Sequence, residues 1–96
     1  MRRDEVVATL TAHREEFVRF GVRSLRLFGS VARDEASASS DVDVLVDFEK
    51  TPTFSEYMKL RIFLEDLLSA TVDLVTEAGL KQRARPHVER DAIRVA

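Results

Sequence analysis

The sequence predicts a mixed α/β (α+β) domain, in which helices pack on a small mixed sheet. Three short stretches rich in apolar residues predict strands, at residues 24–28, 41–48 and 71–75. Two longer stretches with apolar residues at helical spacing predict helices, one from Asp4 to about Phe20 and one after Pro52. Helices that alternate with strands along a chain favour a layer of helices on a sheet. We expect the 96 residues to form one domain, 1–96.

The first half of the chain contains two glycines that are expected to end elements. The first helix should end at Gly21 and the first strand at Gly29. His13 lies near the apolar stripe of that helix, which favours a partly buried histidine over a metal ligand. After Gly29, residues 30–36 predict one or two helical turns and the polar run 37–40 predicts a loop.

The second long helix has a clear start signal, because Thr53 and Glu56 have the spacing of a capping box. Its apolar stripe consists of Phe54, Tyr57, Leu60, Leu64, Leu67 and Leu68. After the third strand, residues 79–85 predict a short helix, and residues 87–92 predict a terminal helix that leads into 93–95.

Composition excludes several classes of protein. The absence of cysteine excludes disulfides, thiolate zinc sites and a cysteine nucleophile, and it indicates a reducing, cytoplasmic setting. No stretch approaches the roughly 18 apolar residues of a membrane span, so we expect neither export nor an anchor. A net charge of −2 provides no broad basic field, and no direct nucleic-acid binding is predicted, although residues 81–94 include five Lys and Arg.

Asp41 and Asp43 are two residues apart on a predicted strand, so their side chains project from one face of it, opposite Val42 and Val44. Two carboxylates this close repel each other unless a cation lies between them, and oxygen ligands favour Mg²⁺ or Mn²⁺. Taken alone, the pair also fits an acidic strand end that is simply solvated.

Gly29 and Ser30 follow a strand and begin a helical stretch. A glycine lets the backbone approach a ligand, and Ser30 with the next N–H groups can hold a phosphate. Taken alone, the pair also fits an ordinary turn with a serine cap. Because Ser30 stands eleven residues before Asp41, with a strand before the glycine and another at the aspartates, the two motifs predict one site. The turn would hold phosphates and the carboxylates would hold a metal.

A third acid, Asp73, alternates with Val72 and Leu74 and is expected to point away from their face. An aspartate in an otherwise apolar strand is disfavoured unless something pairs with it, and a metal would serve. As a general base, Asp73 could also take the proton of an attacking hydroxyl.

The segments 27–33, 40–46 and 72–75, which carry Gly29-Ser30, the two aspartates and Asp73, together resemble the polymerase-beta-type nucleotidyltransferase superfamily. More narrowly, the chain is similar to the minimal nucleotidyltransferases (MNT) that pair with HEPN-domain toxins in prokaryotic toxin–antitoxin systems. The resemblance covers nearly the whole chain and implies a nucleotidyltransferase-like core.

The resemblance also implies a three-carboxylate, two-metal site that uses ATP as substrate. Asp41 and Asp43 would hold both Mg²⁺ ions, with Mn²⁺ as an alternative metal. Asp73 would help to hold the catalytic ion and activate the acceptor. Gly29 and Ser30 would bind the triphosphate.

Arg33 is expected to contact phosphate or the acceptor, and the alternative is a solvated helix residue. The family commonly has a glycine after this arginine, whereas this chain has Asp34. We expect Asp34 to tighten the turn less than a glycine would, or to add a negative charge near the phosphates. Either effect would put the catalytic efficiency in doubt more than the membership of the family.

Other sites with two aspartates fit this chain less well. In haloacid-dehalogenase phosphatases the aspartates end an apolar strand, whereas here polar residues precede them and apolar residues follow. A calcium loop needs a glycine where Leu45 or Val46 stands. The chain has no Walker-type loop, and 96 residues leave no room for the separate donor and acceptor domains of most glycosyltransferases.

The leading functional hypothesis is an antitoxin that transfers AMP from ATP to a hydroxyl of a cognate HEPN toxin. In line with the resemblance, the expected acceptor is a tyrosine. Because the chain has no separate acceptor-binding domain, we expect the toxin to complete the site in a hetero-oligomer, through the second helix or the basic tail. The alternative is a non-catalytic antitoxin that neutralises the toxin by binding alone. Self-modification at Tyr57 is a weaker hypothesis, because Tyr57 fits the apolar stripe.

Overall fold

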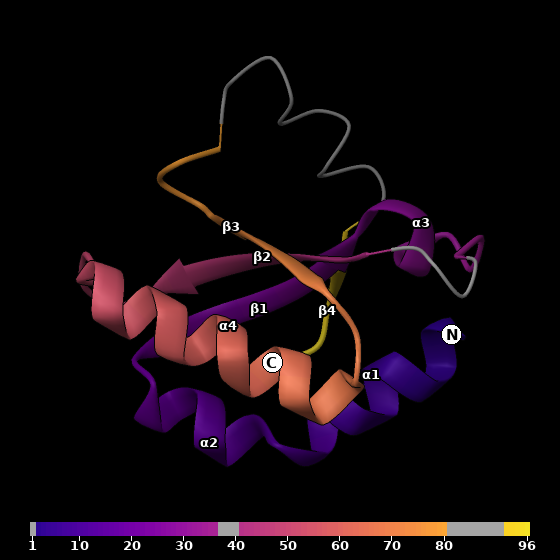
Figure 1. Cartoon of the computed structure of the whole chain (residues 1–96), viewed down its shortest axis with the longest axis horizontal. Coiled ribbons are helices and arrows are strands. Elements are labelled where there is room, and N and C mark those ends of the chain that lie inside the picture. The colour runs from indigo at the N-terminus through magenta and orange to yellow at the C-terminus, as the bar shows by residue number, and fades with distance from the viewer. Residues whose placement is uncertain (1, 37–40, 81–91) are drawn as a thin grey trace.

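A four-stranded mixed sheet with the strand order β3-β2-β1-β4 forms the centre of the fold. The structure, a computed structural model, describes residues 2–36, 41–80 and 92–96. β1 (Val22–Phe28) runs antiparallel to β2 (Val42–Phe48) and to β4 (Ile93–Arg94), whereas β2 runs parallel to β3 (Val72–Thr76). Figure 1 shows α1, α2 and α4 on one side of this sheet. The predicted mixed α/β fold, with helices on a small mixed sheet, is confirmed.

The helices of the described residues are α1 (Arg3–Ala12), α2 (Arg14–Arg19), α3 (Gly29–Ala32) and α4 (Phe54–Leu68). None of them is long and apolar enough to cross a membrane. The predicted first helix is wrong in one respect, because it breaks at His13, where φ is −110° and ψ is 23°. The His13 Nδ1 lies 2.8 Å from the Thr9 carbonyl oxygen, and its ring packs edge-on against Phe63. His13 is therefore a partly buried histidine, as predicted.

α4 begins with the predicted capping box. The Glu56 N–H donates to the Thr53 hydroxyl at 3.1 Å, and the Thr53 N–H donates to the Glu56 carboxylate at 2.8 Å. Each bond satisfies an N–H group that a helix start otherwise leaves unpaired. The hydrogen bond from the Thr53 backbone contributes most to holding the pKa of the Glu56 carboxyl below its usual value, and the Thr53 side chain lowers it further.

Side chains of α4 also bond the main chain of β3, which is an edge strand. The Tyr57 hydroxyl donates to the Leu74 carbonyl, and the Val72 N–H donates to the Glu65 carboxylate at 3.0 Å. Tyr57 is half-buried and packs against the core. Its hydroxyl thus has a structural partner, which argues against self-modification at this residue.

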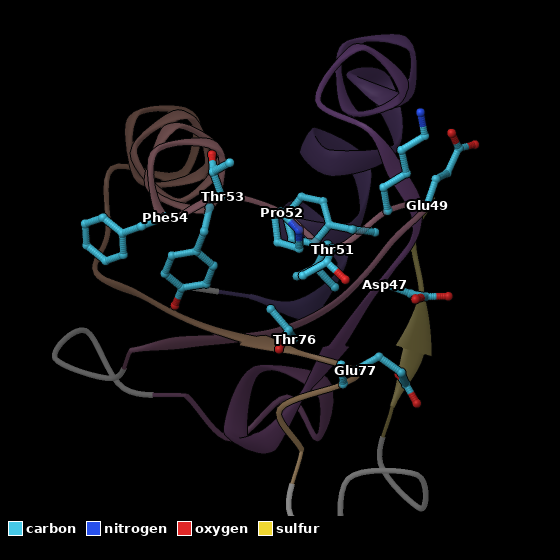
Figure 2. Close-up of a pocket in the computed structure, with 13 residues that line it drawn as sticks. Asp47, Glu49, Thr51, Pro52, Thr53, Phe54, Thr76 and Glu77 are labelled. Carbon is cyan, nitrogen blue, oxygen red and sulfur yellow. The ribbon is translucent and has the colours of Figure 1, made fainter.

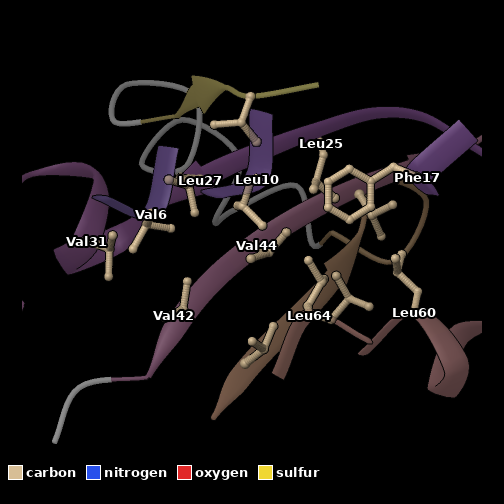
Figure 3. Close-up of a cluster of buried hydrophobic side chains, with 14 of the residues drawn as sticks. Val6, Leu10, Phe17, Leu25, Leu27, Val31, Val42, Val44, Leu60 and Leu64 are labelled. Carbon is tan, nitrogen blue, oxygen red and sulfur yellow. The ribbon is translucent and has the colours of Figure 1, made fainter. Parts of the chain in front are cut away.

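The hydrophobic core lies between the helices and one face of the sheet (Figure 3). On β2, Val42, Val44 and Val46 are each 0% exposed, and Leu60 and Leu64 of α4 belong to the same cluster. The other core residues labelled there are Val6, Leu10, Phe17, Leu25, Leu27 and Val31. Full burial of one such aliphatic side chain contributes about 1.5–3 kcal/mol, so this cluster is the main source of stability.

The C-terminal part of the chain differs from the prediction. Gly79 ends a turn that begins at Glu77, Leu80 is not helical, and the Gly79 N–H donates to the Thr76 hydroxyl at 3.0 Å. The remaining residues of the two predicted helices lie outside the described residues, except Ala92, which is not helical. Ile93 and Arg94 form a strand that the sequence did not predict. The predicted loop 37–40 also lies outside the described residues.

Candidate active site

Asp43 is at the centre of the candidate site. The β1–β2 register places it opposite Phe28, the residue before Gly29, and the parallel β2–β3 register places it beside Asp73. Val42 and Val44, the neighbours of Asp43 on β2, are buried on the helix side, so Asp43 and Asp73 project from the other face of the sheet. Three segments that are far apart in the sequence therefore meet in one row.

Gly29 packs directly against Asp43. Its φ of +71° lies in the left-handed region that favours glycine. A Cβ atom at this position would lie 3.0 Å from Asp43 Cγ and closer still to Oδ2. Both the backbone conformation and the contact therefore require glycine, and the turn after β1 is held against the carboxylate.

Ser30 lies in the first turn of α3, and its side chain is partly buried. Its carbonyl oxygen accepts the Glu35 N–H at 2.8 Å, which closes the turn after α3. Phe28 at the N-cap position supplies no capping side chain to this short helix. The structure thus places Ser30 next to the Gly29–Asp43 contact, where the sequence predicted a phosphate-binding turn.

Arg33 follows α3 and is close enough to Asp43 to lower the pKa of that carboxyl. Its Nε also lies 3.3 Å from the Glu35 carboxylate. The next residue, Asp34, adopts a φ of 59°, which explains why a glycine is common at this position. The Asp34 carboxylate accepts the N–H of Arg3 at 3.0 Å and so fixes the start of α1. Asp34 therefore ties the turn to α1.

The charges around Asp43 are predominantly negative. Partial burial raises the pKa of the Asp43 carboxyl most, and the nearby carboxylates of Asp73 and then Asp41 raise it further, whereas Arg33 opposes them. Asp41 is exposed just before β2, and Asp73 is exposed on β3. The three aspartates that the sequence proposed thus interact electrostatically.

This donor set fits a hard divalent cation. Three mutually repelling carboxylates supply only oxygen atoms, which is the ligand chemistry of Mg²⁺. In the described residues no three acidic or histidine side chains are already close enough to hold an ion together. The fit consequently rests on ligand chemistry and on the positions of the aspartates in one region of the sheet.

A cavity of about 450 Å³ lies elsewhere, between the start of α4 and the last residues of β2 and β3 (Figure 2). The residues labelled there include Asp47, Glu49, Thr53, Phe54 and Glu77. None of the predicted site residues lines this cavity. Its rim carries the acids Asp47, Glu49 and Glu77 together with Lys50.

The profile of the nucleotidyltransferase domain family matches residues 10–95. The chain belongs to this family. This nucleotidyltransferase domain is 44% identical over 93 residues to the protein adenylyltransferase MntA of Thermococcus cleftensis, an alignment that covers 96% of the chain and 94% of its relative.

Solved structures agree with this assignment. One chain assigned as a minimal nucleotidyltransferase is 42% identical and superposes with a TM-score of 0.84, covering 97% of this domain and 95% of that chain. A complex of an AMPylated HEPN toxin and an MNT antitoxin from Shewanella oneidensis superposes with a TM-score of 0.63 at 17% identity, covering 91% and 71%. A toxin–antitoxin structure with AMP-PNP superposes with a TM-score of 0.70 at 19% identity, covering 85% of this domain and 71% of that chain. The last two show the shared fold, and the resemblance to MNT proteins is confirmed.

Proposed function

We propose that this domain is an antitoxin that transfers AMP from ATP to a hydroxyl of a partner protein. The observation that carries the proposal is the row in which Gly29, Asp43 and Asp73 meet on the face of the sheet opposite the buried valines of β2. The 44% identity to an adenylyltransferase supports protein as the acceptor and AMP as the transferred group.

The roles follow from the positions of the side chains. Gly29 and Ser30 would hold the triphosphate, since main-chain N–H groups at the start of a helix can bind phosphate and Gly29 packs against Asp43. Asp41, Asp43 and Asp73 would hold Mg²⁺, which would neutralise phosphate charge and align the reacting groups.

The acceptor hydroxyl would form a bond to the α-phosphorus of ATP, the bond from that phosphorus to the bridging oxygen would break, and pyrophosphate would leave. Asp73 is the most accessible carboxylate of the row, so it would accept the proton of the attacking hydroxyl. Arg33, which already offsets the charge at Asp43, would stabilise negative charge that accumulates on the phosphates.

The proposed acceptor is a tyrosine of a cognate HEPN toxin. The structural neighbours include a complex of an MNT antitoxin with such a toxin, and α4 of this domain carries two large apolar side chains that are exposed. Phe54 and Ile62 are eight residues apart on α4 and are 77% and 52% exposed. A toxin docked on α4 would have to reach around the β3 edge to the opposite face of the sheet to complete the site in a hetero-oligomer.

The test is a transfer assay with labelled ATP, Mg²⁺ and the toxin. The wild-type domain should label the toxin, and Asp43→Asn should abolish labelling. Asp47→Asn, on the same face of β2 but four residues from the site, is the matched control and should retain labelling. Omission of Mg²⁺ or substitution of the acceptor tyrosine by phenylalanine should also abolish it. If Asp43→Asn inhibits the toxin as fully as the wild type and no label is transferred by either protein, the domain acts by binding alone.

A further inference from the structure

Two arginines lie opposite each other on the face of the sheet that carries the aspartates. The β1–β4 register pairs Arg26 with Arg94, and the β1–β2 register pairs Arg26 with Leu45. Leu45 follows Asp43 by two residues on β2, so both project from the same face. Arg26 and Arg94 therefore share the face of Asp43 and Asp73, one row farther along the strands, a shift of roughly 7 Å.

The backbone brings the two arginines close together. The Val95 N–H donates to the Leu25 carbonyl at 2.9 Å, which places Arg26 and Arg94 between ladder bonds. Opposite residues at such positions have Cα atoms only about 4.5 Å apart. Like charges at directly opposite positions destabilise an antiparallel pair. Arginine stays protonated in proteins, so loss of a proton cannot relieve this repulsion.

No aspartate or glutamate side chain of the described ranges forms an ion pair with either arginine. Arg26 forms no ion pair with any residue of the described ranges, and the Arg94 Nε donates to the Ala96 carbonyl at 3.0 Å. Other arginines are compensated, since Arg23 lies 3.5 Å from an Asp47 oxygen and Arg61 pairs with a glutamate one turn later. The Arg26–Arg94 pair is the exception among the cross-strand charges described.

We propose that Arg26 and Arg94 form a phosphate-binding site that serves the transfer reaction. The inference rests on the proposed function for its ligand, which is either the triphosphate of ATP or the phosphodiester of a nucleotide already attached to the acceptor. Guanidinium groups bind phosphate oxygens in a planar, bidentate manner. An anion between the two guanidinium groups is attracted to both of them and so offsets their mutual repulsion. Asp43 lies within the length of one nucleotide from this arginine pair.

Binding is tested first with inorganic tripolyphosphate and the melting temperature of the domain. The wild-type protein should melt at a higher temperature in its presence, and Arg26→Gln and Arg94→Gln should lose most of that increase. Arg19→Gln is the control, because Arg19 is exposed on α2, on the opposite side of the sheet. Without tripolyphosphate, Arg26→Gln should melt at or above the wild-type temperature, since repulsion is removed, whereas a merely structural arginine would give a lower value. Equal increases in all four proteins would overturn the inference.

Transfer assays then distinguish the two sources of phosphate. If the triphosphate is the ligand, Arg26→Gln should raise the KM for ATP about tenfold, which corresponds to the loss of one charge-assisted hydrogen bond. If the attached nucleotide is the ligand, the first transfer is unchanged and transfer to an acceptor that already carries AMP slows by a similar factor. If neither rate changes, the inference is wrong. Asp43→Asn should lose transfer and keep the response to tripolyphosphate, so failure of the proposed function would be seen separately.

Discussion

Alternate side chains of β2 have different environments on the two faces of the sheet. Val42, Val44 and Val46 face the helices and are each 0% exposed, whereas Asp43 is half-buried on the other face, beside Asp73. The helix face gains stability from removal of apolar surface from water. On the other face, partial burial raises the pKa of the Asp43 carboxyl, and the neighbouring carboxylates raise it further. Stability and the candidate chemistry are therefore separated residue by residue along one strand.

The largest effect on stability is expected on the helix face. Leu64→Ala should lower the free energy of unfolding by about 2–5 kcal/mol, because the side chain is fully buried and its removal leaves a cavity. Urea denaturation measures the change, and transfer per folded molecule should stay unchanged. Ile62→Ala on the same helix is the control, since that side chain is 52% exposed and its loss should change stability far less. Equal losses in the two variants would contradict the assignment of the core.

On the face of Asp43, Gly29→Ala should combine a smaller loss of stability with a large loss of transfer activity. The left-handed conformation alone costs a residue with a Cβ about 1–2 kcal/mol. Gly21 provides a matched control, because its φ is +80° and nothing lies within 4 Å of a Cβ there. Both variants should lose similar stability from backbone strain, but only Gly29→Ala should displace Asp43 and lower transfer, by at least about 100-fold if one carboxylate is misplaced. Comparable transfer by both variants would remove Gly29 from the site.

The start of α4 should contribute an intermediate amount to the stability of the helix layer. Thr53→Ala removes the capping hydroxyl and should lower the free energy of unfolding by about 1 kcal/mol. Ser55→Ala, an exposed position in the first turn, is the control and should change it little. The folded-state pKa of Glu56 is lowered by its bonds to Thr53, so this stabilisation is present above the ordinary pKa and is lost as the pH falls through the lowered one. Measurement of unfolding in urea across acidic pH tests both statements.

The smallest expected effect on stability is an increase in the free energy of unfolding, not a decrease. Without divalent cations, Asp43→Asn should raise the free energy of unfolding at neutral pH by roughly 0.5–1 kcal/mol, because it removes a carboxylate opposed by like charges. The folded-state pKa of Asp43 lies above its ordinary value near 3.8, so the charged group opposes folding, and stability falls as the pH rises through these two pKa values. The difference between variant and wild type should therefore shrink in acid, where both side chains are neutral. A variant that is less stable than the wild type at neutral pH would contradict this account of the site.

Local signals account for most of what could be predicted from the sequence. Gly29 as the end of a strand and the Thr53–Glu56 capping box depend on contacts within a few residues, and both were predicted. The alternation of Asp43 with buried valines likewise predicted which face it occupies. Such local signals predict on which helix or strand each motif lies. The catalytic and binding roles of the site residues stay predictions.

The sequence could not show features that depend on distant pairing. β4 has only two residues, too few for alternation to be recognised, and it forms because Arg94 and Ile93 pair with β1. For the same reason Arg26 was not assigned to the site. The parallel register that sets Asp43 beside Asp73 joins residues thirty positions apart. No local pattern predicts such a pairing, so only the resemblance to a family placed Asp73 in the same site as Asp43. The break at His13 was missed because the helical spacing of apolar residues continues through it.

The bonds from Tyr57 and Glu65 to the main chain of β3 limit how this small domain can assemble with other chains. An edge strand with unpaired main-chain groups is a template for strand addition and for aggregation. Here a phenolic hydroxyl and a carboxylate occupy the Leu74 carbonyl and the Val72 N–H. A fifth strand would have to displace both of them. Strand addition at the β3 edge, by a partner or by a second copy of the domain, is therefore disfavoured.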